Sequence, residues 1–283
     1  MKKKSIIISI LLICSMLLSF TPVIFGNYAS ASTGAANFLP NVFFDPTNKG
    51  FDTLNEIQRS QNVTNYISSL LVSRYGSGCV TTGINGTATK LNYQARLSNL
   101  QNYDKIVFFS KGHRSNTNNQ LGIIPNYTTP YPDPSSYLLG SEIYPYTSAK
   151  NVVTFMWHCE TALSYPGNGL PYSFTHNNGM NYYDNTGSQV YLGWSNKYVF
   201  TATYPNGTQN TYSQVGSPQY EWKMTPSNDY GRIAELYWYY MCLNKSSIEA
   251  LDQATFLTQN VYFGYSNIYY WLIIWGNQDL TLP

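Results

Sequence analysis

Charged side chains are scarce in this chain of 283 residues. Asp, Glu, Lys and Arg make up 11% of the sequence, whereas about a quarter is usual in soluble domains. The 16 basic and 14 acidic residues nearly balance. Phosphate binding needs clustered Lys and Arg, so this balance argues against nucleic acid as a partner. The 27 tyrosines, with Asn, Ser and Thr, supply most of the surface instead.

Long apolar runs are absent after the N-terminal segment, because no later stretch reaches the roughly 18 to 20 apolar residues that span a bilayer. At the start of the chain, basic residues 2–4 precede an apolar run at 6–20 and small residues at 29–31. This order is typical of a secretory signal peptide. The sequence therefore predicts that residues 1–31 are removed, and that the protein is secreted without a membrane span.

An exported chain can carry glycans on Asn-x-Ser/Thr sequons. An Asn- and Thr-rich sequence also makes such triplets by chance, so both interpretations stay open. The five sequons begin at Asn62, Asn85, Asn126, Asn206 and Asn244.

Cysteine is scarce as well. Of the four cysteines, Cys14 falls within the predicted signal peptide. Three thiols in an exported chain favour one disulfide and one free cysteine. We expect Cys79 and Cys242 either to pair with each other or to lie buried, which leaves Cys159 reduced.

Strand-like and helix-like segments alternate along the chain, which predicts an α/β domain over residues 41–283 after a tether at 32–40. Capping boxes at Thr53/Glu56 and Ser246/Glu249 mark the starts of two helices. Strands are predicted at 41–44, 79–84, 104–110, 151–157, 189–194 and 269–275. Helices are predicted at 53–75, 91–100, 228–243 and 246–259, with one helical turn near 141–142 and an insertion or β-ribbon at 196–226.

Two of the predicted strands lead directly into residues that can perform chemistry. The run at 104–110 is followed after two residues by His113, and the run at 151–157 by His158 and Cys159. Short runs rich in Val, Ile and Phe indicate buried parallel strands, and active sites of open α/β sheets lie beyond the carboxyl ends of such strands. The imidazole of His113 and the thiol of Cys159, 46 residues apart, are therefore a candidate base and nucleophile.

These segments resemble the clan of cysteine peptidases that contains caspases, gingipains, clostripain, legumain and CHAT-domain proteases. Phe-Ser-Lys-Gly-His at 109–113 resembles the strand that ends in Ser-Gly-His-Gly, and Phe-Met-Trp-His-Cys-Glu-Thr-Ala at 155–162 resembles the Ser-Ala-Cys-Glu-Thr-Ala segment. The resemblance spans roughly residues 41–283. It implies a caspase-like three-layer sandwich, with a mostly parallel central sheet and helices on both faces. Segments 88–104, 190–194 and 276–280 match the flanks of the family pattern in the same order.

The resemblance also implies an activity, that of a secreted cysteine endopeptidase acting on protein or peptide substrates. Cys159 would attack the scissile carbonyl to form an acyl-thioester, and His113 would serve as acid–base. The backbone N–H groups of Cys159 and Arg114 would hold the oxyanion. No cofactor is implied. The chain departs from the family in having Arg114 where Gly is usual and His158 where Ala is usual.

Other side chains have weaker assignments. Glu142 is a candidate to orient His113, although a solvated carboxylate at a helix start is the simpler interpretation. Asp184 and Glu160 are nominal candidates for a pocket that reads the substrate, and a preference for a polar or small substrate residue is equally open.

The remaining histidines are expected to be structural. His158 should point away from Cys159 and be packed or hydrogen-bonded, because adjacent strand residues face opposite sides. His176, in a Gly- and Asn-rich stretch, is expected to be solvated. A metal site formed by the histidines and Cys159 is a further alternative, but the spacing matches no zinc pattern, so no metal is predicted.

Two rival functions stay open. One is a catalytically degenerate surface, adhesion or glycan-binding protein on the same fold, since Tyr side chains offer an apolar ring with a polar tip. The other is self-processing, in which the chain cuts its own segment at 32–50 or 196–226.

Overall fold

A computed structural model describes residues 38–44, 54–83, 90–112, 120–122, 137–158, 161–162, 169–194, 200–203, 209–212, 230–259 and 272–283. Contacts divide the chain into the segments 1–35 and 36–283, and all of the described residues belong to the second. The predicted signal peptide therefore lies outside the described residues.

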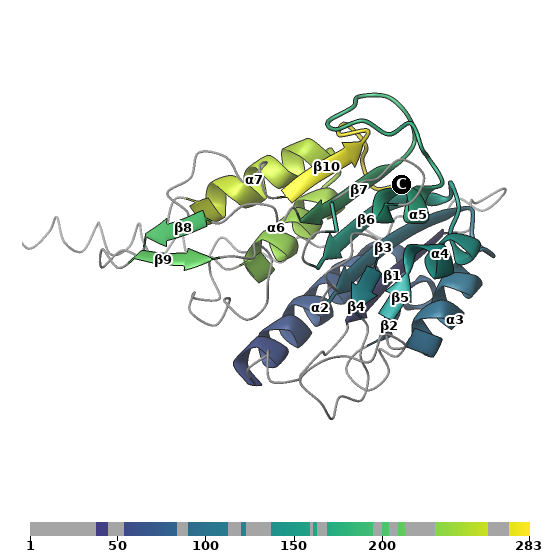
Figure 1. Ribbon diagram of the computed structural model, residues 1–283, viewed down its shortest axis with the longest axis horizontal. Coiled ribbons are helices and arrows are strands. Elements are labelled where there is room, and N and C mark those ends of the chain that lie inside the picture. Colours follow the sequence, from purple (N-terminus) through teal and green to yellow (C-terminus); the bar gives the residue numbers. More distant parts are fainter. Residues whose placement is uncertain are drawn as a thin grey trace, which may run out of the picture. The chain divides into compact units, whose positions relative to one another are not determined.

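A six-stranded mixed sheet forms the centre of this unit (Figure 1). Its neighbouring strands are parallel, except that β10 and β7 are antiparallel. The sequence prediction of an α/β fold is thereby confirmed. In sheet order the strands are β10 (Leu272–Gly276), β7 (Val190–Trp194), β6 (Asn151–Trp157), β3 (Lys105–Lys111), β1 (Phe38–Phe44) and β2 (Thr81–Gly83).

The first strand begins earlier than the sequence suggests. β1 starts at Phe38, so the last residues of the predicted 32–40 tether belong to the sheet. Pro40 has a register partner on β3 but none on β2, whose pairing with β1 begins at Asn41. Proline is tolerated in a sheet where the strand edge beside it is open, because the missing N–H then leaves no ladder acceptor unpaired.

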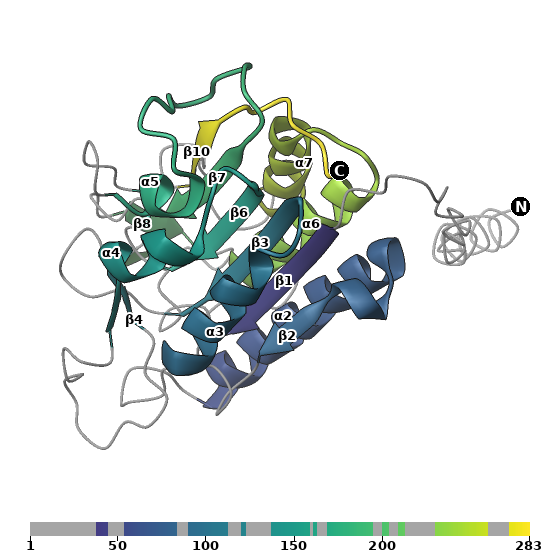
Figure 2. The same ribbon diagram turned by 90° about the vertical axis from the view of Figure 1, so that its right-hand side faces the viewer.

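Helices cover both faces of the sheet (Figure 2). α2 (Leu54–Tyr75), α6 (Tyr230–Cys242) and α7 (Ser247–Gln259) pack on one face and form the α2–α6–α7 layer. α3 (Lys90–Leu100), α4 (Gly140–Ile143) and α5 (Leu170–Thr175) form the α3–α4–α5 layer on the other. Strand β3 contributes Val107 and Phe109 to the first layer and Ile106 and Phe108 to the second. Both faces of β3 are buried, which explains its continuous apolar sequence.

Several small elements complete the described fold. β8 (Phe200–Thr203) and β9 (Gln209–Tyr212) form an antiparallel pair inside 196–226, which confirms the β-ribbon prediction for that segment. The helical turn predicted near 141–142 is α4, followed by the 3-10 helix η4 (Tyr144–Tyr146). The pairing of β4 (Gln120–Gly122) with β5 (Tyr137–Leu139), and the helix α5, were not predicted from the sequence.

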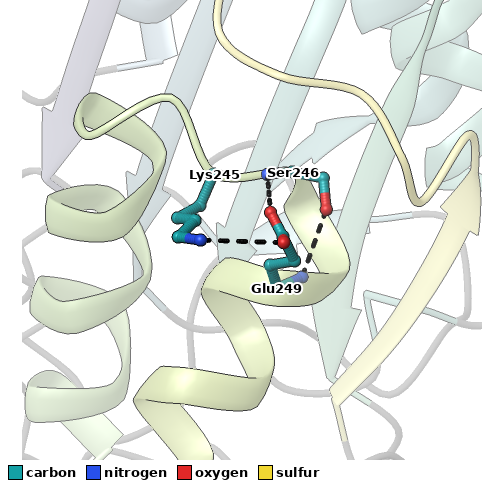
Figure 3. Close-up of polar contacts among 3 residues, drawn as sticks. All are labelled: Lys245, Ser246 and Glu249. Carbon is teal, nitrogen blue, oxygen red and sulfur yellow. Dashed lines mark hydrogen bonds and ion pairs between the residues drawn. The ribbon is translucent and has the colours of Figure 1, made fainter.

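The capping box predicted at the start of α7 is confirmed (Figure 3). The Ser246 N–H donates to Glu249 Oε2 at 3.0 Å, and the Glu249 N–H donates to Ser246 Oγ at 3.3 Å. Lys245 Nζ lies 3.7 Å from Glu249 Oε1. The hydrogen bond from the Ser246 backbone lowers the pKa of Glu249, because it stabilises the charged carboxylate.

The disulfide considered between Cys79 and Cys242 is not formed, since both are free thiols. Cys79 ends the 3-10 helix η1 (Ser77–Cys79), where a strand was predicted, and is half-buried. Cys242 is buried at the end of α6 and packs in the α2–α6–α7 layer as a small apolar side chain. Burial raises the pKa of the Cys242 thiol to about 12. Of the two alternatives given by the sequence, pairing or burial, burial is the one that describes Cys242.

This arrangement predicts unequal reactivity of the two thiols. In the native protein at neutral pH, iodoacetamide should modify Cys79 well before Cys242, because only the thiolate reacts and the Cys242 thiol stays protonated. In denaturant, both should react at similar rates. Peptide mass spectrometry measures the two sites separately, and recovery of a disulfide-linked peptide pair containing Cys79 and Cys242 would contradict the structure.

Candidate active site

The candidate site lies where β3 and β6 end side by side near the middle of the sheet (Figures 1 and 2). From Val107↔Val153 to Lys111↔Trp157, each residue of β3 pairs with the residue of β6 that is 46 positions later in the chain. The Gly112 N–H donates to the Trp157 carbonyl oxygen at 3.3 Å, which carries the contact one residue beyond β3. The two strands therefore stay in register up to the last described residues before His113 and Cys159.

The predicted catalytic residues themselves lie outside the described residues. His113 and Arg114 follow Gly112 directly, and Cys159 and Glu160 follow His158 directly. The structure thus fixes the ends of both strands and the residues that lead into the predicted nucleophile and base.

His158 is buried and hydrogen-bonded, as the sequence predicted. Its Nε2 lies 2.7 Å from the Oγ of Ser110, and neither side chain is exposed to solvent. Ser110 alternates with Phe109 and Lys111 along β3, so it faces the α3–α4–α5 layer, where Phe108 packs. This hydrogen bond joins the carboxyl ends of β3 and β6 on that face of the sheet.

The two residues after Glu160 are held firmly against β7. Thr161 Oγ1 donates to the His158 carbonyl oxygen at 2.9 Å. The Tyr191 hydroxyl donates to the Thr161 carbonyl oxygen at 2.9 Å, and the Ala162 N–H donates to the Trp194 carbonyl oxygen at 3.1 Å. Both sides of the dipeptide Cys159–Glu160 are therefore fixed to the sheet.

Trp275 of the edge strand β10 completes this support. Its indole Nε1 donates to the Ala162 carbonyl oxygen at 2.8 Å. Sequence reasoning placed Trp275 only in a strand and missed this contact, because the two residues are far apart in the chain and β10 reaches Ala162 across β7. The feature of the sequence that pointed to this region was Thr161-Ala162, which belongs to the Cys-Glu-Thr-Ala segment.

Gly193 of β7 allows the 161–162 segment to approach the sheet. A Cβ atom at this position would lie 2.8 Å from both the Ala162 nitrogen and the Thr161 carbonyl carbon. These are backbone atoms, which cannot move aside as the end of a flexible side chain can. A glycine is needed here for close backbone approach, which is the usual reason for a glycine inside a strand.

Lys111 is the residue that sequence reasoning overlooked. This last residue of β3 is 1% exposed, and its Nζ lies 4.2 Å from the centroid of the Trp157 ring. Nζ has no hydrogen-bond acceptor in the part of the chain that the structure describes. The sequence feature that could have revealed this burial is a lysine at the end of a strand whose other residues are mostly apolar.

Glu142 has partners of its own. Its Oε1 lies 2.7 Å from Lys90 Nζ of α3, and its Oε2 accepts a hydrogen bond from the Leu139 N–H at 2.9 Å. One carboxylate oxygen thus caps the start of α4, and the other forms an ion pair with α3. This arrangement favours the helix-start interpretation of Glu142 over a role in orienting His113.

Asp184 is also engaged locally. Its Oδ1 accepts hydrogen bonds from the Asn185 N–H at 2.8 Å and from the Thr186 hydroxyl at 2.9 Å. The Thr186 hydroxyl bond lowers the pKa of Asp184, because it stabilises the carboxylate. Asp184 therefore organises a turn, and Glu160, the other nominal substrate-reading residue, lies outside the described residues.

His176 is not the freely solvated residue that the sequence suggested. It follows α5 with a left-handed backbone (φ 57°), and its ring stacks on Tyr144 at a centroid distance of 3.7 Å. Its Nε2 lies 2.9 Å from the Tyr144 carbonyl oxygen. Partial burial lowers the pKa of His176. Within the described ranges, no group of three or more His, Cys, Asp and Glu side chains is arranged to hold a metal ion.

Comparison with known proteins adds no relative. No protein-family model matches this chain, and a search of curated proteins finds no match. Among the helices that the structure describes, none has the length and hydropathy that crossing a bilayer requires.

The close approach at Gly193 gives a test of this architecture. Gly193→Ala should lower the free energy of unfolding by about 1 to 3 kcal/mol, the usual cost of overpacking a buried site. Urea unfolding measures the difference. Gly78→Ala is the matched control, because a Cβ at Gly78 meets nothing within 4 Å. An unfolding free energy for Gly193→Ala as high as that of the control would show that the 161–162 segment does not lie against β7 as described.

Proposed function

We propose that this chain is a cysteine endopeptidase in which Cys159 is the nucleophile and His113 is the general acid–base. The observation that carries the proposal is the β3–β6 register. His113 and Cys159 each follow by two positions a member of the last pair, Lys111↔Trp157. The same register, continued by two residues, would pair His113 with Cys159. Neighbouring strands lie about 4.8 Å apart, so the two side chains would be within reach of each other.

The orientation of His158 supports the same pairing. Side chains alternate between the two faces of a sheet, and His158 points toward Ser110 on the α3–α4–α5 side. The residue after His158 is then expected on the α2–α6–α7 side, where Trp157 packs. His113, two residues after Lys111, is expected on that side as well. Imidazole and thiol would share one face.

The fold that accompanies this proposal is a caspase-like three-layer sandwich. It is supported by the mostly parallel sheet and by helices on both of its faces. These are the features that the family resemblance implies. The domain that we propose extends from about residue 38 to the C-terminal residues. These include the sheet strand β10, whose Trp275 indole donates a hydrogen bond to the Ala162 carbonyl oxygen.

The chemistry follows from these residue types. A thiol with an ordinary pKa near 8.5 is mostly protonated at neutral pH, and the imidazole of His113 would accept its proton. The Cys159 thiolate then attacks the scissile carbonyl carbon, and the N–H groups of Cys159 and Arg114 hold the oxyanion. His113 returns the proton to the leaving amine. Water hydrolyses the acyl-thioester and regenerates the thiol, so the cycle needs no cofactor.

The anchoring of residues 161–162 is consistent with this role. An oxyanion site needs backbone N–H groups that are held in place before the reaction, because reorganising them during the reaction would cost activation energy. The contacts of Thr161 and Ala162 with β7 and β10 supply such rigidity one residue beyond Glu160.

Secretion is the second part of the proposal, based on the signal-like segment 1–31. Of the five sequons, two have their Asn in a described, exposed position, Asn62 and Asn244. Thr64, the third residue of the first sequon, is buried in α2. Asn244 Oδ1 accepts a hydrogen bond from Arg74 Nη2 at 2.8 Å. We expect Asn244 to be the better glycan acceptor of the two. Its sequon lies between α6 and α7, whereas the sequon of Asn62 lies inside α2.

One observation favours the rival, a non-catalytic glycan-binding or adhesion protein. Tyr144 is 36% exposed and stacks on His176, and Tyr172 lies beside it with ring centroids 5.2 Å apart. Such aromatic groups offer apolar plates with polar edges, which suit sugar rings. This group lies at η4 and α5, and its presence does not depend on Cys159.

The position of β1 limits where the chain could cut its own segment 32–50. The candidate segment 32–50 contains β1, which lies between β3 and β2 in the sheet. Cleavage within residues 38–44 would require removing a strand paired on both sides. A self-cleavage event in this segment would therefore fall before residue 38 or after residue 44.

The proposal predicts covalent labelling of Cys159 by an acyloxymethylketone peptide probe under reducing conditions. His113→Ala should reduce hydrolysis of a peptide library by about 100- to 10,000-fold, the usual contribution of a general acid–base. Cys159→Ala should abolish hydrolysis. Cleavage is measured by mass spectrometry of the library, and labelling by mass spectrometry of the protein.

His176→Ala is the matched control, since it removes an imidazole that is engaged with Tyr144 rather than placed at the strand ends. It should retain labelling and hydrolysis. A folded wild-type protein in which the probe leaves Cys159 unlabelled would overturn the peptidase proposal and favour the binding protein. Hydrolysis that persists in Cys159→Ala would assign the activity elsewhere.

A further inference from the structure

Strand β10 stands at one end of the sheet, among the strands that the structure describes. Its inner side pairs with β7 along the whole of Leu272–Gly276. The outer side of such a strand presents backbone N–H and C=O groups to which another chain can add a strand. The residues at 269–275, Tyr-Tyr-Trp-Leu-Ile-Ile-Trp, include no charge, proline or glycine. Segments of this composition add readily to other strands, so an open edge here would promote association.

Residues 181–184, which we call the strap, lie along the outer side of β10. The Gly276 N–H donates to the Asn181 carbonyl oxygen at 2.9 Å. The Tyr183 N–H donates to the Ile274 carbonyl oxygen at 3.1 Å. The outward backbone groups of Ile274 and Gly276 that an added strand would need are therefore already bonded within the chain.

A ring contact holds the strap in place. Tyr182 forms an antiparallel bridge with Trp275, and the centroids of the two rings are 3.8 Å apart. Trp275 is 9% exposed, and its indole is the group that bonds to Ala162. Tyr182 is 53% exposed. The Tyr182 ring therefore covers the edge strand from the solvent side.

The strap ends in a way that stops the sheet from growing further. Tyr183 has a left-handed backbone (φ 49°), which is unfavourable for a bulky side chain and incompatible with an extended strand. Asp184 comes next, accepts a hydrogen bond from the Gln278 N–H at 2.7 Å, and begins the turn described above. A short, kinked segment that carries a charged side chain is a usual means of protecting the edge of a sheet.

We propose that the strap keeps the outer edge of β10 from pairing with a strand of a second copy of this chain. This inference does not depend on the proposed function, because it concerns backbone groups at the end of the sheet and no step of a reaction. A second copy carries the same uncharged edge. The strap belongs to the same chain as β10, so its local concentration far exceeds that of a second copy and it occupies the edge first.

The test is Tyr183→Pro in the full chain. Proline lacks the N–H that bonds to the Ile274 carbonyl oxygen, and its fixed φ of about −65° excludes the left-handed conformation. Self-association is measured by size-exclusion chromatography with light scattering over a range of concentrations. It should become about tenfold tighter or more, because the released edge groups then bond to a second copy. The wild type should have the mass of a single chain over the same range.

Tyr183→Asn is the matched control, because Asn keeps the N–H and tolerates the left-handed conformation. It should have the mass of a single chain. Hydrogen–deuterium exchange locates the contact in Tyr183→Pro. The peptide that contains Leu272–Gly276 should exchange more slowly in the associated sample than in the diluted one. The Ile274 N–H points to the same outer side as the Ile274 carbonyl group, so an added strand protects it.

A folded Tyr183→Pro protein with the mass of a single chain at every concentration would overturn the inference. Association that leaves the exchange of β10 unchanged would do the same, as would wild-type association that protects β10.

Tyr182→Ala covers the case in which Tyr183→Pro does not fold. Tyr182 is exposed, and this change removes its ring from Trp275 without deleting a backbone donor or acceptor. The strap should then open more often, so that self-association is several-fold tighter than in the wild type, with the same protection of β10. A Tyr182→Ala protein that associates no more tightly than the wild type would contradict the proposed role of the strap.

Discussion

The pairing of β3 with β6 is the constraint on which the rest of this account depends. Two parallel neighbours in a sheet cannot slip by one residue without turning every buried side chain to the opposite face. Here a slip by one residue would separate Phe109 from Phe155, which stack on each other in the α2–α6–α7 layer. The apolar core thus sets the register, and the register determines which residues meet beyond the strand ends. The proposed pairing of His113 with Cys159 relies on the same offset of 46 residues that relates β3 to β6.

The hydrogen bonds around the strand ends strengthen this constraint. Ser110 and His158 join β3 to β6 on one face, while Lys111 lies over Trp157 on the other. Beyond the predicted nucleophile, Thr161 ties the chain to His158 and to β7. Buried polar groups that are hydrogen-bonded, as Ser110, His158 and Thr161 are, specify one arrangement of the backbone more strongly than apolar contacts do. His158, which stands where the resemblance described above would place Ala, is accommodated in this way, because its ring finds a buried partner in Ser110.

The sequence predicted the α/β class and most of the strands of the sheet, because short apolar runs rich in Val, Ile and Phe can be recognised from the local sequence alone. It also predicted that His158 is packed or hydrogen-bonded, and it predicted the capping box at Ser246. It missed the role of Trp275, since nothing near that residue in the chain indicates a contact with Ala162. It considered a disulfide that is absent, because cysteine counts carry no distance information. Lys111 was overlooked because its contact with the Trp157 ring comes from β6, which is remote in the sequence.

The most direct measurement of the central claim is a disulfide cross-link between positions 113 and 159. In the variant His113→Cys, mild oxidation of the folded protein should join position 113 to Cys159, because paired residues on adjacent strands have the Cα separation that a disulfide needs, about 4.4 to 6.8 Å. The variant Arg114→Cys is the control, since a shift of one residue directs the new side chain to the other face. The account predicts a 113–159 cross-link in the first variant and none to Cys159 in the second, each identified by mass spectrometry. A cross-link from position 114 without one from position 113, or none from either, would contradict the register on which the proposed site is built.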